Sequence, residues 1–331
     1  MHGPLTSRRL VGAVRLLLTL AAVGIIAYVV DWDRFIEALL DTEASLLVLA
    51  YGMFMLDRLL MSYKWGLLLK VQQVRIPLWE NWAVYSLASL WSVVLPSTVG
   101  ADALRVCWLW RRGNEGTAGT VSVVLERLIG FATGLSIAVL ALLYLMGRHG
   151  RLDLREPLVL VGSVLALMVL GLGLSFNTRV GSAVARAWRR GGSTSRLAGL
   201  VERLGSAYLA YRLAPGTMLV FLLLTLGEQL LTLAMGYTIA VAVGIPASAL
   251  DFCAAFSLAL LVSRLPISID GIGVFEGVLM LLLSLAGVAP AQALALAIIG
   301  RFMNVLIFAP GTVVALLFSD FRPGEMHARE V

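Results

Sequence analysis

The chain has 331 residues, of which 60% are hydrophobic and 14% are charged, with a formal net charge of +6. An ordinary soluble domain carries about 25% charged residues, and several apolar runs here exceed the ~18 residues that cross a bilayer. The composition therefore predicts an all-α polytopic membrane protein without a separate soluble domain, and it argues against nucleic-acid binding. The two cysteines predict neither a disulfide framework nor a metal site. No Walker A sequence is present, and no cofactor is expected.

The first half of the chain predicts three membrane spans and one hairpin. Apolar runs over 10–30, 44–63 and 118–146 are long enough to cross, and the arginines before the first run place the N-terminus in the cytoplasm. Residues 80–95 end at Pro96 and lead to a short helix with three arginines. A full crossing would put these arginines outside, so we expect a re-entrant hairpin that opens to the cytoplasm. The basic residues expected in the cytoplasm after the second span are Lys64, Lys70 and Arg75.

The second half repeats this order of elements. Runs over 157–175, 216–243 and 291–318 predict three spans, and 250–264 with a helix over about 274–287 predicts a second hairpin, entered from outside. Between the first two of these spans lies a connector that holds seven arginines and one acid, the strongest sign of a cytoplasmic location. Its helical periodicity fits a helix on the inner leaflet or a solvated loop equally well. This connector covers residues 176–215.

The two hairpins share a spacing of a proline, a glycine and a charge. Pro96 leads to Gly100-x-Asp102-x-x-Arg105, and Pro266 leads to Gly271-x-Gly273-x-x-Glu276. Because three spans per half is an odd number, the second half is predicted to be inverted relative to the first, as in many transporters. The expected unit is one membrane domain, 1–331, with repeat one over about 10–146 and repeat two over about 157–318. The residues expected to break the helices are Pro96, Gly100, Pro266, Gly271 and Gly273.

Charged side chains within the apolar runs are candidates for a site, because a charge at the centre of a bilayer costs at least ~2.5–3.5 kcal/mol. The helices that follow the two breaks would begin with free N–H groups, which favour an anion. For each charge the alternative is a structural ion pair, which we expect for Arg58 and Arg264. The predicted substrate-binding residues are Asp102, Arg105, Glu126, Arg127, Asp270, Glu276 and Arg301. The predicted proton-coupling residues are Glu126 and Glu228.

Four stretches carry a family resemblance: Arg58-Leu-Leu-Met-Ser-Tyr-Lys-Trp65, Leu95-Pro-Ser-Thr-Val-Gly-Ala-Asp-Ala-Leu-Arg105, Val123-Val-Leu-Glu-Arg-Leu-Ile-Gly130 and Pro266-Ile-Ser-Ile-Asp-Gly-Ile-Gly-Val-Phe-Glu-Gly277. In this order they resemble the flippase-like membrane family that includes the transmembrane region of lysylphosphatidylglycerol synthases. Glu126 stands where members of that family have Asp. The resemblance implies movement of lipids or lipid-linked groups between leaflets. An aminoacyl-transferase domain follows in the synthases and none follows here, so we expect no enzyme activity.

The preferred hypothesis is a lipid flippase of the cell (inner) membrane with both termini in the cytoplasm. It would move a phospholipid, hopanoid or polyprenyl-linked headgroup, with Arg105, Arg127 and Arg301 on the phosphate. The alternatives are a secondary transporter of a small anionic solute, an accessory protein or enzyme that acts on lipid-linked sugars, and a scaffold that transports nothing. Membrane lipids are the expected partners, and a homo-oligomer or a lipid-modifying enzyme is left open.

Overall fold

The computed structural model describes residues 4–94, 98–113, 116–150, 152–175, 204–265 and 267–318. Within these ranges the chain forms helices and no strands, which confirms the all-α prediction. Five helical segments are long and apolar enough to cross a membrane. They are α3 (Ala44–Val71), α6 (Gly116–His149), α7 (Arg155–Ser175), α10 (Pro215–Ala242) and Pro290–Leu317, which is divided into α13 (Pro290–Leu306) and α14 (Phe308–Phe318).

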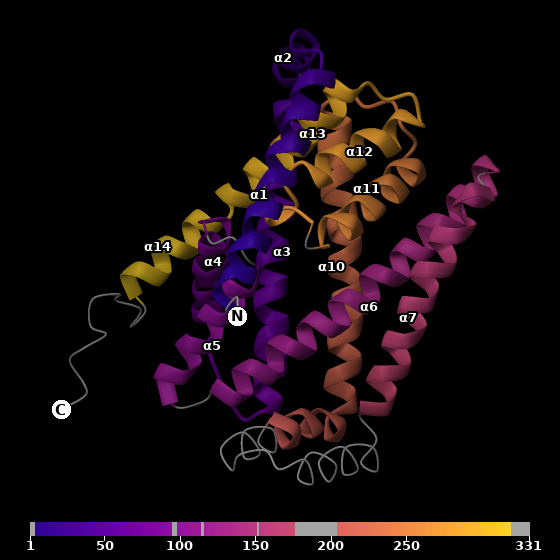
Figure 1. The fold of residues 1–331 in the computed structure, drawn as a ribbon. Helices are drawn as coiled ribbons and strands as arrows, with labels where there is room; N and C mark the ends of the chain where they lie inside the picture. Colours follow the sequence, from indigo (N-terminus) through magenta and orange to yellow (C-terminus); the bar gives the residue numbers. More distant parts are fainter. Residues whose placement is uncertain are drawn as a thin grey trace.

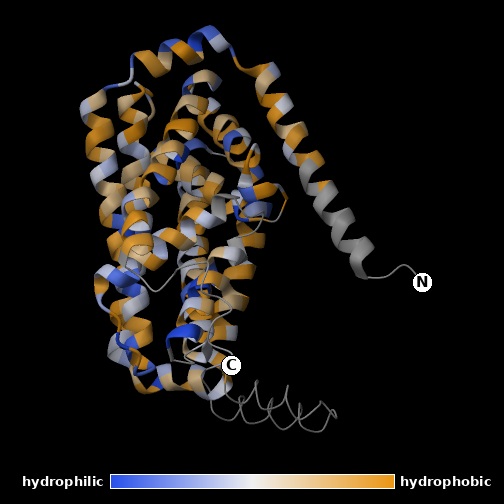
Figure 2. Ribbon diagram, turned by 90° about the vertical axis from the view of Figure 1, so that its left-hand side faces the viewer, coloured by the Kyte–Doolittle hydropathy of each residue, from blue (hydrophilic) through white to orange (hydrophobic). Residues whose placement is uncertain are grey.

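The N-terminal helix is α1 (Pro4–Val29), which covers most of the predicted first span over 10–30. It packs on the second half of the chain, and its described C-terminal part leads up to α2 at one end of the bundle (Figure 2). A short helix, α2 (Trp32–Leu40), follows, and the Asp31 carboxylate caps it by accepting the Arg34 N–H.

Two helix pairs occupy the places of the predicted hairpins. The first is α4 (Leu78–Val94) with α5 (Thr98–Gly113), and the second is α11 (Ala249–Ser263) with α12 (Val274–Ser284). At 1.5 Å per residue these helices are about 16–26 Å long, shorter than the ~30 Å hydrocarbon core of a bilayer. In Figure 1 the first pair lies in the lower half of the bundle and the second pair lies in the upper half.

The long helices of each half pack on the helix pair of the other half. α6 packs against α11, and α14 packs against α4, while α3 and α10 lie side by side in the middle (Figure 1). The close α4–α14 crossing is possible because Gly311 faces Ser86: a Cβ built at Gly311 would lie 2.2 Å from the Ser86 Oγ. Each half therefore covers the other's short helices.

The turn between α11 and α12 needs residues that tolerate a left-handed backbone. Asp270, Gly271 and Gly273 have φ of 50°, 68° and 79°. This confirms the prediction that Gly271 and Gly273 adopt backbone conformations that other residues resist. Thr19 of α1 accepts the Ile269 N–H at 3.0 Å, so α1 holds this turn. Pro96 and Pro266 lie outside the described residues. Gly100 is a correction: it lies within the first turn of α5, because that helix already begins at Thr98.

We expect Gly273→Ala to destabilise this turn. A Cβ at Gly273 would lie 2.5 Å from the Ala22 Cβ of α1, and the φ of 79° is unfavourable for alanine, so the cost is about 1–3 kcal/mol. The thermal midpoint of the purified protein measures this loss. Gly277→Ala is the matched control, because Gly277 is helical and a Cβ there meets no atom within 4 Å. Equal midpoints for the two variants would contradict the prediction.

Candidate functional site

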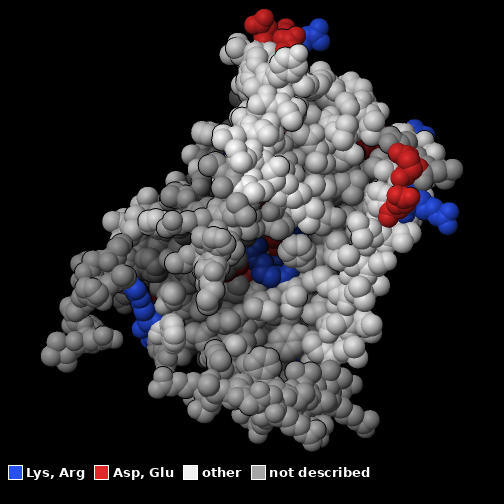
Figure 3. All heavy atoms as spheres, viewed as in Figure 1, with Lys and Arg blue, Asp and Glu red and all other residues white. Residues whose placement is uncertain are grey.

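A cavity of about 310 Å³ lies inside the bundle, between α3, α10, α11, α12 and α13. Phe54, Phe256 and Phe275 form part of its apolar wall. Its charged and amide-bearing lining residues are Asp57, Arg58, Asp270, Arg301 and Asn304. Figure 3 shows basic and acidic side chains recessed at mid-height of a largely uncharged face. Since an apolar wall with a few convergent polar groups is typical of a ligand site, this cavity is the candidate site.

Arg301 of α13 is held by two carboxylates of the second helix pair. Its Nε lies 2.5 Å from the Glu276 Oε1, and its Nη1 lies 3.9 Å from the Asp270 Oδ2. Glu276 is nearly buried, and its other oxygen accepts the Gly273 N–H at 2.7 Å. The N-terminus of α12 is therefore capped by its own Glu276. This bond occupies the N–H of Gly273, and anion binding at the N-terminus of α12 stays a prediction.

Asp57 and Arg58 of α3 form an ion pair beside Arg301. The Arg58 Nη2 donates to the Asp57 Oδ2 at 2.6 Å, and the guanidinium also lies 5.6 Å from the Phe308 ring. The structural ion pair predicted for Arg58 is present, yet it faces the cavity. Among the described residues Arg264 has no such carboxylate partner and lies over the Phe131 ring instead.

The sequence prediction missed this pair as part of the site. Asp57 was not among the predicted site residues, and Arg58 was expected to serve only in an ion pair. Phe54, Asp57 and Arg58 all line the cavity, and their i, i+3, i+4 spacing puts them on one helix face. This spacing is the sequence signal that could have identified Asp57 and Arg58 as site residues.

Four of the predicted residues form a separate cluster between α5 and α6. Arg105 is 2% exposed and donates to Asp102 at 2.7 Å and to Glu126 at 3.0 Å. Its guanidinium also lies 4.4 Å from the centre of the Tyr85 ring. Among the described residues, Arg105 is therefore enclosed by Asp102, Glu126 and Tyr85.

Arg127 completes the cluster at its open side. Its Nε donates to the Asp102 Oδ2 at 2.9 Å, and its side chain is 51% exposed. The Tyr85 hydroxyl donates to Glu126, so both oxygens of that carboxylate have partners. The structure thus places the seven predicted residues in two groups. Asp270 and Arg301 line the cavity, Glu276 lies behind them, and the other four lie in the α5–α6 cluster.

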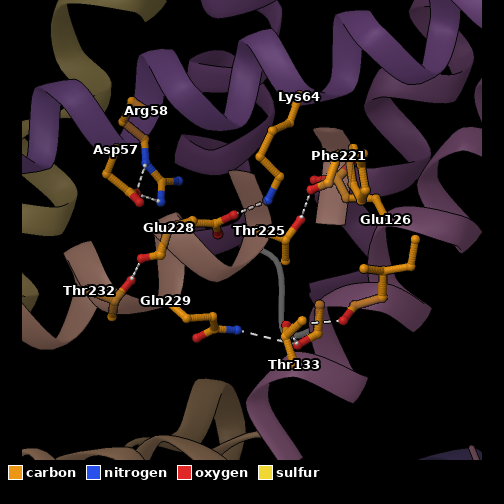
Figure 4. A network of polar contacts seen from close by, with 12 residues as sticks. Asp57, Arg58, Lys64, Glu126, Thr133, Phe221, Thr225, Glu228, Gln229 and Thr232 are labelled. Carbon is orange, nitrogen blue, oxygen red and sulfur yellow. Dashed lines mark hydrogen bonds and ion pairs between the residues drawn. The ribbon is translucent and has the colours of Figure 1, made fainter. Parts of the chain in front are cut away.

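Lys64 and Glu228 form a further ion pair, between α3 and α10 (Figure 4). Lys64 is 3% exposed and lies 5.1 Å from the centre of the Phe221 ring. The predicted end of the second span at residue 63 is therefore wrong, because α3 continues to Val71 and Lys64 is buried within it. The apolar ring and the carboxylate of Glu228 together make a buried place for the ammonium.

Comparisons with known proteins agree with this helical membrane architecture. No curated protein matches the chain at a significant level. The family model described as "Lysylphosphatidylglycerol synthase TM region" matches residues 12–311, nearly the whole chain. The chain therefore belongs to the lysylphosphatidylglycerol synthase transmembrane-region family.

Proposed function

We propose that the protein is a flippase-like transporter that moves a lipid headgroup between leaflets through the central cavity. The observation that carries this proposal is the cavity itself, which presents two guanidinium groups and two carboxylates inside an apolar bundle. Such groups are costly within a bilayer and mark transport pathways more often than structural positions. Membership of a lipid-associated membrane family supports a lipid as the substrate. The transported lipid is a phospholipid, hopanoid or polyprenyl-linked lipid, and the protein itself catalyses no covalent reaction.

We further propose that the two halves are inverted repeats with re-entrant hairpins α4–α5 and α11–α12. The reciprocal packing of α6 on α11 and of α14 on α4 supports this arrangement. A repeated ion pair supports it too: Arg127 of α6 bonds Asp102 of the first pair, and Arg301 of α13 bonds Glu276 of the second. Inverted repeats of this kind place a substrate site near the midplane of the membrane. Both termini then lie in the cytoplasm of the cell in whose inner membrane the protein is embedded.

Within this proposal Arg301 and Arg58 bind the headgroup phosphate, because both line the cavity. Arg301 is 34% exposed despite its carboxylate partners, and the guanidinium fork matches a phosphate in a bidentate manner. Arg105 and Arg127 instead attach the first hairpin to α6. A phosphate contact by Arg105 requires the α5–α6 cluster to open.

Arg301→Gln is expected to slow lipid movement in liposomes by about tenfold or more, since a hydrogen bond to a charged group contributes about 1.5–3 kcal/mol. The measurement is the transbilayer movement of labelled phospholipid and polyprenyl-phosphate probes after reconstitution. Arg34→Gln is the control, because Arg34 pairs with Asp31 on the exposed surface of α2, away from the cavity. Wild-type rates in the Arg301→Ala, Glu276→Ala double variant would contradict the site assignment.

The same cavity chemistry also suits a small soluble anion, so the experiment includes one. Saturable uptake of a phosphate ester by the liposomes, without competition from lipid, would replace the flippase by a secondary transporter. Movement of the lipid probes without uptake of the ester supports the flippase.

A further inference from the structure

Asp57 has one carboxylate oxygen without a partner. Its side chain is 3% exposed, Oδ2 accepts from Arg58, and Oδ1 is closed off from solvent without a hydrogen-bond donor. The other carboxylates of the described network differ. Glu126 has partners on both oxygens, Glu276 likewise, and Glu228 pairs with Lys64. Among the described residues, Asp57 is thus the carboxylate with a buried oxygen left unsatisfied.

The groups around Asp57 are themselves charged or polar. Arg58 follows it on α3, and Glu228 and Thr232 lie on the neighbouring α10 (Figure 4). Asp270, from the turn before α12, lines the same cavity, as do Arg301 and Asn304 of α13. Two of these neighbours are carboxylates and two are guanidinium groups. Both hydrogen bonds that the ionised Asp57 accepts from described residues come from Arg58, and both go to Oδ2.

A proton is the ligand that fits Oδ1. An unsatisfied buried carboxylate oxygen is costly, and in this conformation Oδ1 is closed off from the cavity, so that no headgroup atom contacts it. A proton needs no additional volume, and it converts the ion into a neutral acid that tolerates burial better. Protonation also removes the charge that holds Arg58.

Resting on the function proposed above, we propose that Asp57 is a proton-binding residue, protonated when a headgroup phosphate binds Arg58. A hydronium ion that enters the cavity with the headgroup donates a proton to the Asp57 Oδ1 and leaves a water molecule. The two hydrogen bonds between Arg58 and the Asp57 Oδ2 then open, and Arg58 donates to a phosphate oxygen instead. The cavity then gains one negative charge from the phosphodiester and one positive charge from the proton. The lipid phosphate and the proton would cross together without a net charge.

The test counts protons taken up on lipid binding. Purified protein is titrated with short-chain phosphatidylglycerol in two buffers of different ionisation enthalpy, and the difference in measured heat gives the uptake. Wild type is expected to take up about one proton per bound lipid at neutral pH. Asp57→Asn is expected to bind lipid without this uptake, and Asp57→Glu, which keeps a titratable group, is expected to restore it. Glu37→Gln, on the exposed side of α2, is the control and should behave as wild type.

Two results overturn the inference while the transport function stands. One is lipid binding by wild type without proton uptake, and the other is full uptake by Asp57→Asn. The wild-type measurement decides the question even where Asp57→Asn fails to fold. If wild type neither binds nor moves any phosphate-bearing lipid, the proposed function itself fails, and the proton-binding role fails with it.

Discussion

Replacing Arg105 by methionine is expected to prevent the protein from accumulating in a folded state. The substitution leaves Glu126, whose side chain is only 11% exposed, with the Tyr85 hydroxyl in place of a base, and it leaves Asp102, 15% exposed, with Arg127 alone. Loss of one partner from a buried ion pair costs about 3–5 kcal/mol, against a total stability of about 5–15 kcal/mol. Size-exclusion profiles in detergent and the thermal midpoint measure the loss.

Arg127→Met is the matched control for this substitution. Arg127 shares Asp102 with Arg105, but its side chain is 51% exposed, so its removal should cost about 1 kcal/mol or less. Adding Asp102→Asn and Glu126→Gln to Arg105→Met should recover part of the midpoint, because neutral amides are less costly to bury than ions. A well-folded Arg105→Met variant with a wild-type midpoint would show that the cluster is not structural.

Much of the fold could be predicted because hydrophobic length and charge bias are local properties of a sequence. The predicted span over 216–243 corresponds to α10 (Pro215–Ala242), and the one over 157–175 corresponds to α7 (Arg155–Ser175). The interrupted patterns around residues 96 and 266 correctly predicted pairs of short helices. The left-handed backbone at Gly271 and Gly273 followed from residue type, since glycine is the residue best suited to positive φ.

The site was less predictable, because its composition depends on which helices meet. Lys64 reads as the end of a span, since a charge in an apolar run marks an interface unless a partner is known. Its partner, Glu228, lies 164 residues further along the chain. Asp57 likewise becomes a cavity residue only because α3 faces α10 and α13. Glu276 was predicted to bind substrate. The structure shows in addition that its carboxylate accepts the Gly273 N–H, a capping role that the spacing of residues alone did not indicate.

The Lys64–Glu228 pair offers the second large effect, and it also tests the coupling role predicted for Glu228. Lys64→Met should lower stability by about 3–5 kcal/mol, because Glu228 then remains largely buried near Asp57 without its base. Lys64→Met combined with Glu228→Met should recover most of that loss, since two apolar side chains can replace a buried pair at little cost. Thermal midpoints of Lys64→Met, Glu228→Met and the double variant complete a double-mutant cycle for this pair.

The exposed pair Arg34–Asp31 provides the control cycle, for which the coupling should be within about 1 kcal/mol of zero. Lipid movement and proton uptake by the double variant then distinguish a structural role of Glu228, as the partner of Lys64, from its predicted role in proton coupling. If the pair only joins α3 to α10, the folded double variant moves lipid and takes up protons as wild type does. A stable double variant that binds lipid but takes up no proton would give the coupling role to Glu228 and remove it from Asp57. Because the double variant lacks both charges, its loss of proton uptake could not be attributed to an unpaired Lys64.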